Sequence, residues 1–184
     1  MKIAVAITGA SGVQYGIRLL QVLTKLNVEI HLVITTAGKE LIDIETNYSS
    51  DVVTSLGTRT YDEMDFTAPI ASGSYVTDGM AIVPCSMKTL GSIANGISGS
   101  LVTRAAEVCL KEGRTLILVP RETPLTPIHL RNMVRVSESG ATVLPACPPF
   151  YSRPTTIEAL IDTIVARILD RLEIEHSISN RWGD

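Results

Sequence analysis

Residues 1–12 read MKIAVAITGASG, a short apolar run that passes directly into a turn of glycine and hydroxyl-bearing residues. The small and β-branched side chains of Ile3–Ile7 are typical of a strand that is buried on both faces. In the turn, Gly9 and Gly12 let the backbone approach a ligand closely, and Ser11 can donate or accept a hydrogen bond. The stretch therefore predicts a buried strand, a turn at a binding crevice and a helix that begins at Val13.

The same succession of strand, turn and helix continues along the chain. We expect further buried strands at Glu29–Ile34, Met80–Val83, Thr115–Val119 and Ala141–Leu144. Helical periodicity extends over Val13–Leu26, Met87–Asn95, Leu101–Glu112, Thr126–Ser139 and Thr155–Leu172. This alternation predicts an α/β fold, a doubly wound parallel sheet in a single domain of residues 1–184. The segment Asn47–Tyr75 is irregular, and we expect one or two short strands in it.

The amino-acid composition limits the classes of protein to which this chain can belong. The 184 residues are 45% hydrophobic and 19% charged, which is enough apolar material for one sizeable core. A formal net charge of -3 leaves no basic field for nucleic acid or anionic lipid, so we expect neither partner. No apolar run reaches the roughly 18 residues that a membrane span needs, and the first residues lack a signal-peptide cleavage site. We therefore expect an unprocessed cytoplasmic protein.

The cysteines and histidines do not indicate a metal. Three cysteines are an odd number without Cys-x-x-Cys spacing, so we interpret them as small buried thiols, at Cys85, Cys109 and Cys147. Three histidines are scattered without ligand spacing, at His31, His129 and His176, and packing or surface roles account for them. No metal site is predicted.

Polar turns follow the expected strands, at Thr8–Gly12, Thr35–Gly38, Pro84–Thr89, Pro120–Leu125 and Pro148–Pro154. Taken singly, a hydroxyl after a strand usually caps the next helix. Because the carboxyl ends of parallel strands meet at one edge of the sheet, these hydroxyls and glycines and the Arg121–Glu122 pair would converge on one crevice. Helix N-termini and an arginine in such a crevice suit a phosphorylated ligand.

Two kinds of phosphorylated ligand would suit such a crevice, a dinucleotide and the mononucleotide FMN. The pattern of Thr8, Gly9, Gly12 and Gly16 is similar to the glycine motif of short-chain dehydrogenases, which bind a dinucleotide. However, the second strand ends in Thr35 rather than in an acidic residue for the ribose, and the chain has no Tyr-x-x-x-Lys pair. FMN needs one phosphate site and donors around its ring, and the small residues at 86–89 leave room for that ring.

Specific motifs along essentially the whole chain resemble the UbiX family of flavin prenyltransferases, once described as phenylacrylic acid decarboxylases. The Pro120–Leu125 block, Pro-Arg-Glu-Thr-Pro-Leu, is the most specific of them. The others are Gly9–Gly12 with Tyr15-Gly16, Ile44–Thr46, Ser72–Ser74, Pro84–Leu90, Arg104–Glu107, Phe150-Tyr151 with Arg153-Pro154, and Ala166–Asp170. Thr35 stands where many relatives have serine, and it keeps the hydroxyl.

The resemblance implies a flavodoxin-like (Rossmann-like) fold assembled into a dodecamer, with FMN bound between neighbouring subunits. It also implies a reaction in which a dimethylallyl group is transferred from dimethylallyl phosphate to N5 and C6 of reduced FMN, closing a fourth ring. The prenylated FMN would then serve a UbiD-type decarboxylase. A monophosphate or a diphosphate donor is left open by the sequence, although the lack of magnesium motifs favours the monophosphate.

The resemblance also implies roles for individual residues. FMN contacts match Gly9, Ala10, Ser11, Thr35, Ser86, Met87, Lys88, Thr89 and Arg121. The prenyl-phosphate site matches Tyr151 and Arg167, joined by Arg104, Lys111 and Glu122. Glu122 is the candidate proton donor to the leaving phosphate, and Ser11 with Glu45 would manage protons at the flavin. Trp182 is a candidate for the same pocket, or for a tail from about residue 173 that docks on a neighbouring subunit.

The residue types suit metal-independent chemistry. Prenyltransferases that use magnesium hold a diphosphate through paired Asp-rich motifs, whereas this chain offers the lone cluster Asp62–Asp65, which we interpret as a solvated turn. Without a metal, cations and proton donors must stabilise the leaving phosphate. Aromatic faces and the electron-rich flavin can stabilise an allyl cation.

Two rival functions remain. Flavin-dependent cysteine decarboxylases share the fold and FMN, but they carry a Pro-x-Met-Asn-x-x-Met-Trp signature and an early histidine base, and this chain has neither. The second rival is an FMN carrier protein without catalytic activity.

Overall fold

The computed structural model describes residues 1–179 and 183. Its strands are β1 (Lys2–Ile7), β2 (Glu29–Ile34), β3 (Arg59–Tyr61), β4 (Gly79–Cys85), β5 (Thr115–Pro120) and β6 (Thr142–Val143). Its helices are α1 (Val13–Lys25), α2 (Thr36–Glu45), α3 (Ser50–Thr54), α4 (Met87–Ala94), α5 (Leu101–Lys111), α6 (Pro127–Glu138) and α7 (Ile157–Arg171), with a 3-10 turn η1 (Pro69–Ala71).

All six strands pair in parallel, in the order β3-β2-β1-β4-β5-β6. The chain therefore winds outward from β1 first in one direction and then in the other, which confirms the doubly wound α/β sheet. The direction changes between β1 and β4, and a crevice opens beyond the carboxyl ends of strands at such a switch point.

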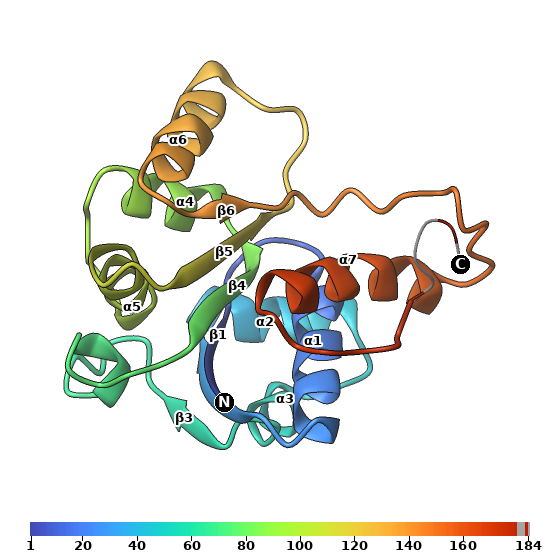
Figure 1. Cartoon of the computed structure of the whole chain (residues 1–184), viewed down its shortest axis with the longest axis horizontal. Helices are drawn as coiled ribbons and strands as arrows, with labels where there is room; N and C mark the ends of the chain where they lie inside the picture. Colours follow the sequence, from blue (N-terminus) through green and yellow to red (C-terminus); the bar gives the residue numbers. More distant parts are fainter. Residues whose placement is uncertain (180–182, 184) are drawn as a thin grey trace.

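The sheet is covered on both faces, and alternate residues of β1 face the two layers. Ile3, Val5 and Ile7 belong to a core shared with α1 and α7. Ala4 and Ala6 belong to a second core shared with α4 and α5. Figure 1 shows the same division, with α1 and α7 on one side of the sheet and α4, α5 and α6 on the other. Burial on both faces explains why β1 reads as a continuous apolar run.

Hydroxyl side chains start most of the helices. The Oγ atoms of Ser86, Ser100, Thr126 and Thr156 each accept a hydrogen bond from the backbone N–H three residues on. This N-cap geometry satisfies one of the amides that a helix leaves unpaired. The expected helices therefore begin and end within about two residues of their predicted bounds, as such patterns allow.

The structure differs from expectation in three places. The segment 47–75 contains the short strand β3, as expected, but also α3 and η1. Cys85 and Cys109 are buried as expected, whereas Cys147 is exposed, because it lies in the loop between β6 and α7. In the tail, Ile174 and Ile178 pack into the α1 and α7 core of their own chain. Trp182 lies outside the described residues, so docking of the tail on a neighbouring subunit stays a prediction.

Candidate active site

A cavity of about 720 Å³ opens at the carboxyl ends of β1, β2 and β4. Pockets for small molecules commonly enclose 300–1,000 Å³, so this β1–β4 cavity has the right size for a cofactor-like ligand. Six of the residues that the sequence assigned to FMN line it, namely Gly9, Thr35, Ser86, Met87, Lys88 and Thr89, and Glu122 lines it as well. These residues come from four separate turns of the chain, whereas Ala10, Ser11 and Arg121, assigned to the same ligand, do not line this cavity.

The wall of the β1–β4 cavity is closely packed backbone. A Cβ atom on Gly9 would come within 2.6 Å of the Ala37 Cβ, and one on Gly38 within 2.7 Å of the Ile7 carbonyl oxygen. Glycine is therefore required at both positions for the turn after β1 to touch the start of α2. The buried Thr8 hydroxyl donates to the Pro84 carbonyl oxygen at 2.8 Å and accepts from the Ser86 N–H at 2.8 Å, which joins the ends of β1 and β4.

Two helices begin at this cavity. The Ser86 Oγ accepts from the Thr89 N–H at 3.2 Å at the start of α4, and the Thr35 Oγ1 accepts from the Gly38 N–H at 3.1 Å at the start of α2. The hydroxyls therefore cap their helices, as the simpler interpretation of the sequence held. They also line the cavity, and the positive end of each helix dipole is directed to it, so the two interpretations are compatible.

Glu63 is a part of this site that sequence reasoning missed. Its Oε1 accepts hydrogen bonds from the Thr36 backbone N–H at 2.7 Å and from the Thr36 hydroxyl at 2.6 Å. The cluster at 62–65 does form a turn, in which the Asp62 and Asp65 carboxylates accept from backbone amides two residues on. Glu63 nevertheless lines the cavity rather than solvent alone. Nothing in the local pattern separates it from its neighbours, because a distant helix supplies its partner.

Ser11 lies between two charged side chains. The Arg121 Nε donates to the Ser11 carbonyl oxygen at 2.9 Å. The Glu45 Oε2 accepts from the N–H of the next residue, Gly12, at 2.8 Å, and from that of Val13 at 3.3 Å. Glu45 thereby caps α1, whose N-cap residue Gly12 has a left-handed backbone and no side chain to do so. The structure thus brings together Ser11, Glu45 and Arg121, which come from three different turns.

A second cavity, of about 540 Å³, lies between α7 and the loop after β6. Tyr151 and Arg167, both assigned to the prenyl-phosphate site, line it together with Cys147, Asp170 and His176. We call it the donor cavity, after the role predicted for Tyr151 and Arg167. The ring of Tyr15, on α1, would lie 3.3 Å from a Cβ built at Gly12, and Tyr15 is also near Cys147 of the donor cavity. Burial raises the pKa of the Tyr15 hydroxyl, and the charge of a Cys147 thiolate would raise it further.

Within one chain, Arg104 and Lys111 reach neither cavity. Both are on α5, which covers the face of the sheet opposite to α7. The Arg104 Nε donates to the Ala71 carbonyl oxygen at 3.1 Å and its Nη1 pairs with Glu107 at 2.9 Å. The Lys111 Nζ pairs with Glu112 at 2.8 Å. Their proposed role at the donor therefore requires a neighbouring copy of the chain.

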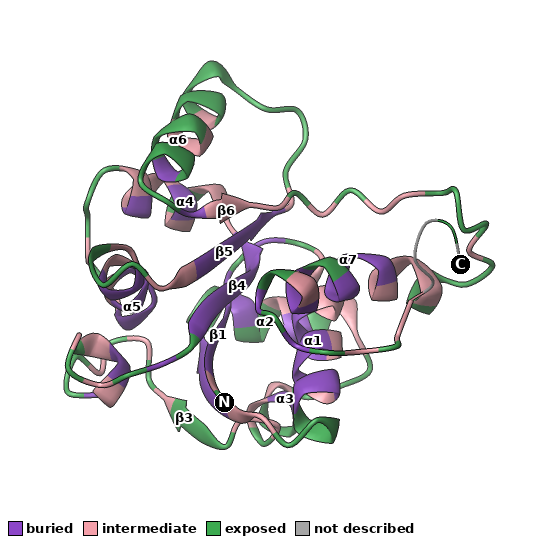
Figure 2. Cartoon of the chain, viewed as in Figure 1, coloured by how far each residue is buried: buried purple, intermediate pink, exposed green. Residues whose placement is uncertain are grey.

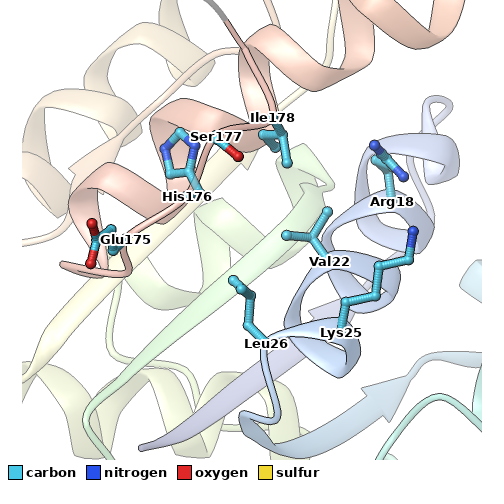
Figure 3. A pocket seen from close by; sticks show the side chains of 8 residues that line it. All are labelled: Arg18, Val22, Lys25, Leu26, Glu175, His176, Ser177 and Ile178. Atoms are coloured by element: carbon cyan, nitrogen blue, oxygen red, sulfur yellow. The ribbon is translucent and has the colours of Figure 1, made fainter.

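A third cavity, of about 450 Å³, contains none of the residues that the sequence singled out for binding. It lies between the second half of α1 and the tail, as Figure 3 shows, and is lined by Arg18, Val22, Lys25, Leu26, Glu175, His176, Ser177 and Ile178. His176 is shared with the donor cavity, so this side chain forms part of the partition between the two.

The described residues contain neither a metal-binding cluster nor a membrane-spanning helix. No group of three or more His, Cys, Asp and Glu side chains within residues 1–179 is arranged to hold a metal ion. Over the same part of the chain, no helix combines the length and the apolar character needed to cross a membrane.

Comparisons with known proteins show the family. A family model described as Flavoprotein matches residues 1–179. The chain is 51% identical to a protein named flavin prenyltransferase UbiX from Halalkalibacterium halodurans, over 98% of this chain and 92% of that protein. It is 46% identical to the Methanocaldococcus jannaschii protein of the same name, over 100% and 99% of the two chains.

Solved structures show the same family. The crystal structure of AnUbiX in complex with FMN and dimethylallyl pyrophosphate matches with a TM-score of 0.98 and 45% identity, over 100% of this chain and 97% of that one. A dodecameric FMN-dependent UbiX-like decarboxylase from Escherichia coli O157:H7 matches over all of both chains with a TM-score of 0.97 and 46% identity. The cysteine decarboxylase TvaF, at 18% identity and a TM-score of 0.67, shares the fold alone. This chain belongs to the flavoprotein family and, within it, to the UbiX flavin prenyltransferases.

Proposed function

We propose that the chain is a flavin prenyltransferase that transfers a dimethylallyl group from dimethylallyl phosphate to N5 and C6 of reduced FMN, without a metal. One observation carries the proposal. Gly9, in the turn after β1, lines the first cavity, and Cys147, which lines the second, is near enough to Tyr15 for a thiolate charge there to raise the pKa of the Tyr15 hydroxyl. Tyr15, in the first turn of α1, lies beside Gly12 of the same turn after β1. A phosphate-bearing acceptor in the first cavity and a phosphate-bearing donor in the second can therefore meet beside this turn, which contains Ser11.

FMN fits the β1–β4 cavity on chemical grounds. Its phosphate would bind where α4 begins, at Ser86, Lys88 and Thr89, because the unpaired amides of a helix start and a lysine favour an anion. Met87 and Ile97 give part of the same wall an apolar surface for a flat ring. Reduced flavin, when bound, supplies the electron-rich ring that attacks the allylic carbon.

The donor fits the second cavity, where Arg167 would bind its phosphate and the Tyr151 ring would cover the five-carbon chain. The bond from N5 to the allylic carbon forms as the C–O bond to phosphate breaks, and the electron pair of the C–O bond stays on the phosphate oxygen. Glu122, which lines the β1–β4 cavity, would donate a proton to that oxygen, and Ser11 with Glu45 would take up the proton released from N5. Closure at C6 adds one proton to the alkene of the transferred group and releases one from C6, so the second bond forms with no net change in protons. Arg121 stabilises the charge that develops between the two sites.

We assign Arg104 and Lys111 to the donor site of a neighbouring subunit. Their place on α5, across the sheet from Arg167, supports this assignment, as does the dodecameric assembly of the E. coli O157:H7 relative. The outer surface of α6 offers apolar area for such an assembly. Figure 2 shows this helix exposed over most of its surface, and Ile128, Leu130 and Val134 are at least half exposed. Such a patch usually marks an interface.

The product would serve as the cofactor of a UbiD-type decarboxylase in the cytoplasm. The chemistry supports a recipient of this kind, because a prenylated flavin made by one protein has to act in another.

One experiment tests the proposal. The purified protein is incubated with reduced FMN and dimethylallyl phosphate in the presence of a chelator, and the flavin is analysed by mass spectrometry. A mass gain of one prenyl unit supports the enzyme, and FMN that is bound but unmodified indicates a carrier. Release of carbon dioxide from an aromatic acid or from a peptidyl cysteine would favour a decarboxylase. Turnover that needs added magnesium would disprove the metal-independent mechanism.

A further inference from the structure

Asp170 is placed where it could neutralise the proposed donor-binding arginine. Arg167 and Asp170 are three residues apart on α7, so they lie on the same face of the helix, and both line the donor cavity. An aspartate and an arginine at this spacing can form an ion pair. Yet none of the described residues forms an ion pair with Arg167, and its guanidinium is exposed to the cavity.

His176 is one of the groups that hold the Asp170 carboxylate. The His176 Nε2 lies 3.2 Å from the Asp170 Oδ1, and the imidazole is only 3% exposed. Because Nε2 faces a carboxylate, it carries a proton and donates to Asp170. The opposite nitrogen, Nδ1, is buried and has no hydrogen-bond partner among the described residues. Burying a ring nitrogen without a hydrogen-bond partner lowers the stability of the fold, and the hydrogen bond to Asp170 offsets part of this loss.

The tail fixes His176 in this position. Leu172 and Ile174 are buried in the α1 and α7 core, and Ile178 packs against the same core on the other side of the histidine. The backbone on both sides of His176 is therefore anchored to its own chain. The Glu173 N–H donates to the Asp170 carbonyl oxygen and the Ile174 N–H to the Leu169 carbonyl oxygen, so the tail begins beside the C-terminal end of α7, where Asp170 lies.

We propose that His176 is a positioning residue for the prenyl donor, which keeps Asp170 away from Arg167 so that the guanidinium is available to the donor phosphate. This inference deepens the proposed function and rests on it. Without the imidazole, the Asp170 carboxylate loses one of its partners, and pairing with Arg167 would then compete with the phosphate. The effect belongs to donor binding, so KM for dimethylallyl phosphate should change while KM for FMN and kcat change little.

A double-mutant cycle tests the proposal. His176→Leu removes the hydrogen bond and keeps an apolar side chain of similar size, and we expect KM for dimethylallyl phosphate to rise about tenfold. His176→Gln, which can still donate to Asp170, should restore most of the native value. Asp170→Asn should lower KM modestly, because it removes a negative charge near the phosphate. The double variant His176→Leu with Asp170→Asn should return KM to within about twofold of the native value.

The cycle separates positioning from a merely structural role. If His176 only anchors the tail, the double variant will bind the donor as poorly as His176→Leu, and this result would overturn the proposal. Glu175→Gln is the matched control, because it changes a neighbouring residue of the tail that lines the third cavity and not the donor cavity. Thermal unfolding of each variant shows that the chain is folded.

A binding measurement keeps the test independent of catalysis. Calorimetric titration of the native protein and the variants with dimethylallyl phosphate should give the same order of affinities as the KM values. If the native protein binds this ligand without prenylating FMN, the proposed function fails while the affinities still decide the role of His176. If His176→Leu binds dimethylallyl phosphate as tightly as the native protein, the inference is wrong whatever the enzyme does.

Discussion

Lys88 lies in the first turn of α4 and is exposed, although a positive charge at this end of a helix opposes the helix dipole. A phosphate bound at this helix start would attract both the lysine charge and the positive end of the dipole. We expect Lys88→Ala to weaken FMN binding about tenfold, because it removes a charge-assisted contact. Riboflavin has the same ring without the phosphate, so its affinity should be unchanged. Fluorescence titration with both flavins measures the difference, and an equal loss for the two would show that Lys88 does not contact the phosphate.

Glu122 borders the β1–β4 cavity, next to Arg121, and its Oε1 accepts from the Thr123 N–H at 3.0 Å. We expect Glu122→Gln to bind FMN normally but to release phosphate from dimethylallyl phosphate 10²–10⁴-fold more slowly, as for other general acids. Single-turnover mass spectrometry of the flavin gives this rate. Unchanged turnover would remove Glu122 from the mechanism.

His31 is a buried residue with a pH-sensitive environment outside the site. Its side chain is 0% exposed, and its Nδ1 lies 2.8 Å from the Tyr61 hydroxyl. Its Nε2 lies 3.2 Å from both the Glu29 carboxylate and the Tyr75 hydroxyl. Burial lowers the pKa of His31 below its usual 6.5. The Glu29 carboxylate raises this pKa and the charges of Arg59 and Lys2 lower it, but burial is the largest effect.

This lowered pKa predicts how stability depends on pH. Above about pH 6.5, His31 is neutral in both states and contributes no pH dependence. As the pH falls below that value, the unfolded chain takes up a proton that the folded chain does not, so the free energy of unfolding decreases until the folded pKa is reached. We expect urea titrations to show a loss between pH 7 and 5 that is smaller in His31→Gln. Equal slopes would contradict the prediction.

At the scale of elements, contacts between a helix and the sheet decide what the sequence tolerates. Gly16 is in the first turn of α1, and a Cβ there would collide with the Val83 carbonyl oxygen of β4. In an exposed helix, Gly→Ala stabilises by roughly 0.5–1 kcal/mol, whereas overpacking a core costs about 1–3 kcal/mol. Because the Val83 carbonyl group is backbone and cannot rotate away, the cost of this collision should exceed the gain in helix propensity.

We therefore expect Gly16→Ala to lower the free energy of unfolding by roughly 1–3 kcal/mol, measured by urea unfolding. Gly99→Ala is the matched control, because a Cβ at Gly99 meets no atom within 4 Å. A Gly16→Ala variant as stable as the Gly99→Ala variant would show that α1 can shift on β4.

At the scale of the whole molecule, the sheet separates the proposed donor cations. Arg167 is on α7 and Lys111 on α5, and these helices cover opposite faces. If a neighbouring subunit supplies Lys111, then Lys111→Ala and Arg167→Ala subunits, each inactive alone, should complement one another. In a randomly mixed oligomer, about a quarter of the interface sites combine an intact Arg167 with an intact Lys111. Prenylation assays after co-refolding measure this recovery, and a mixture that stays inactive would contradict the shared site.

The sequence by itself determined the alternation of strands and helices, the parallel sheet and the turns that form the site. These features depend on local physics, because β-branched runs, helix caps and glycine turns are specified within about a dozen residues. The tertiary structure decided the pairings between distant residues. Glu63 with Thr36, Glu45 with Gly12, and His176 with Asp170 each join turns or helix ends whose meeting depends on how the layers pack. No local pattern encodes such contacts, since a carboxylate in a turn has the same neighbours in sequence whether it faces solvent or a helix end.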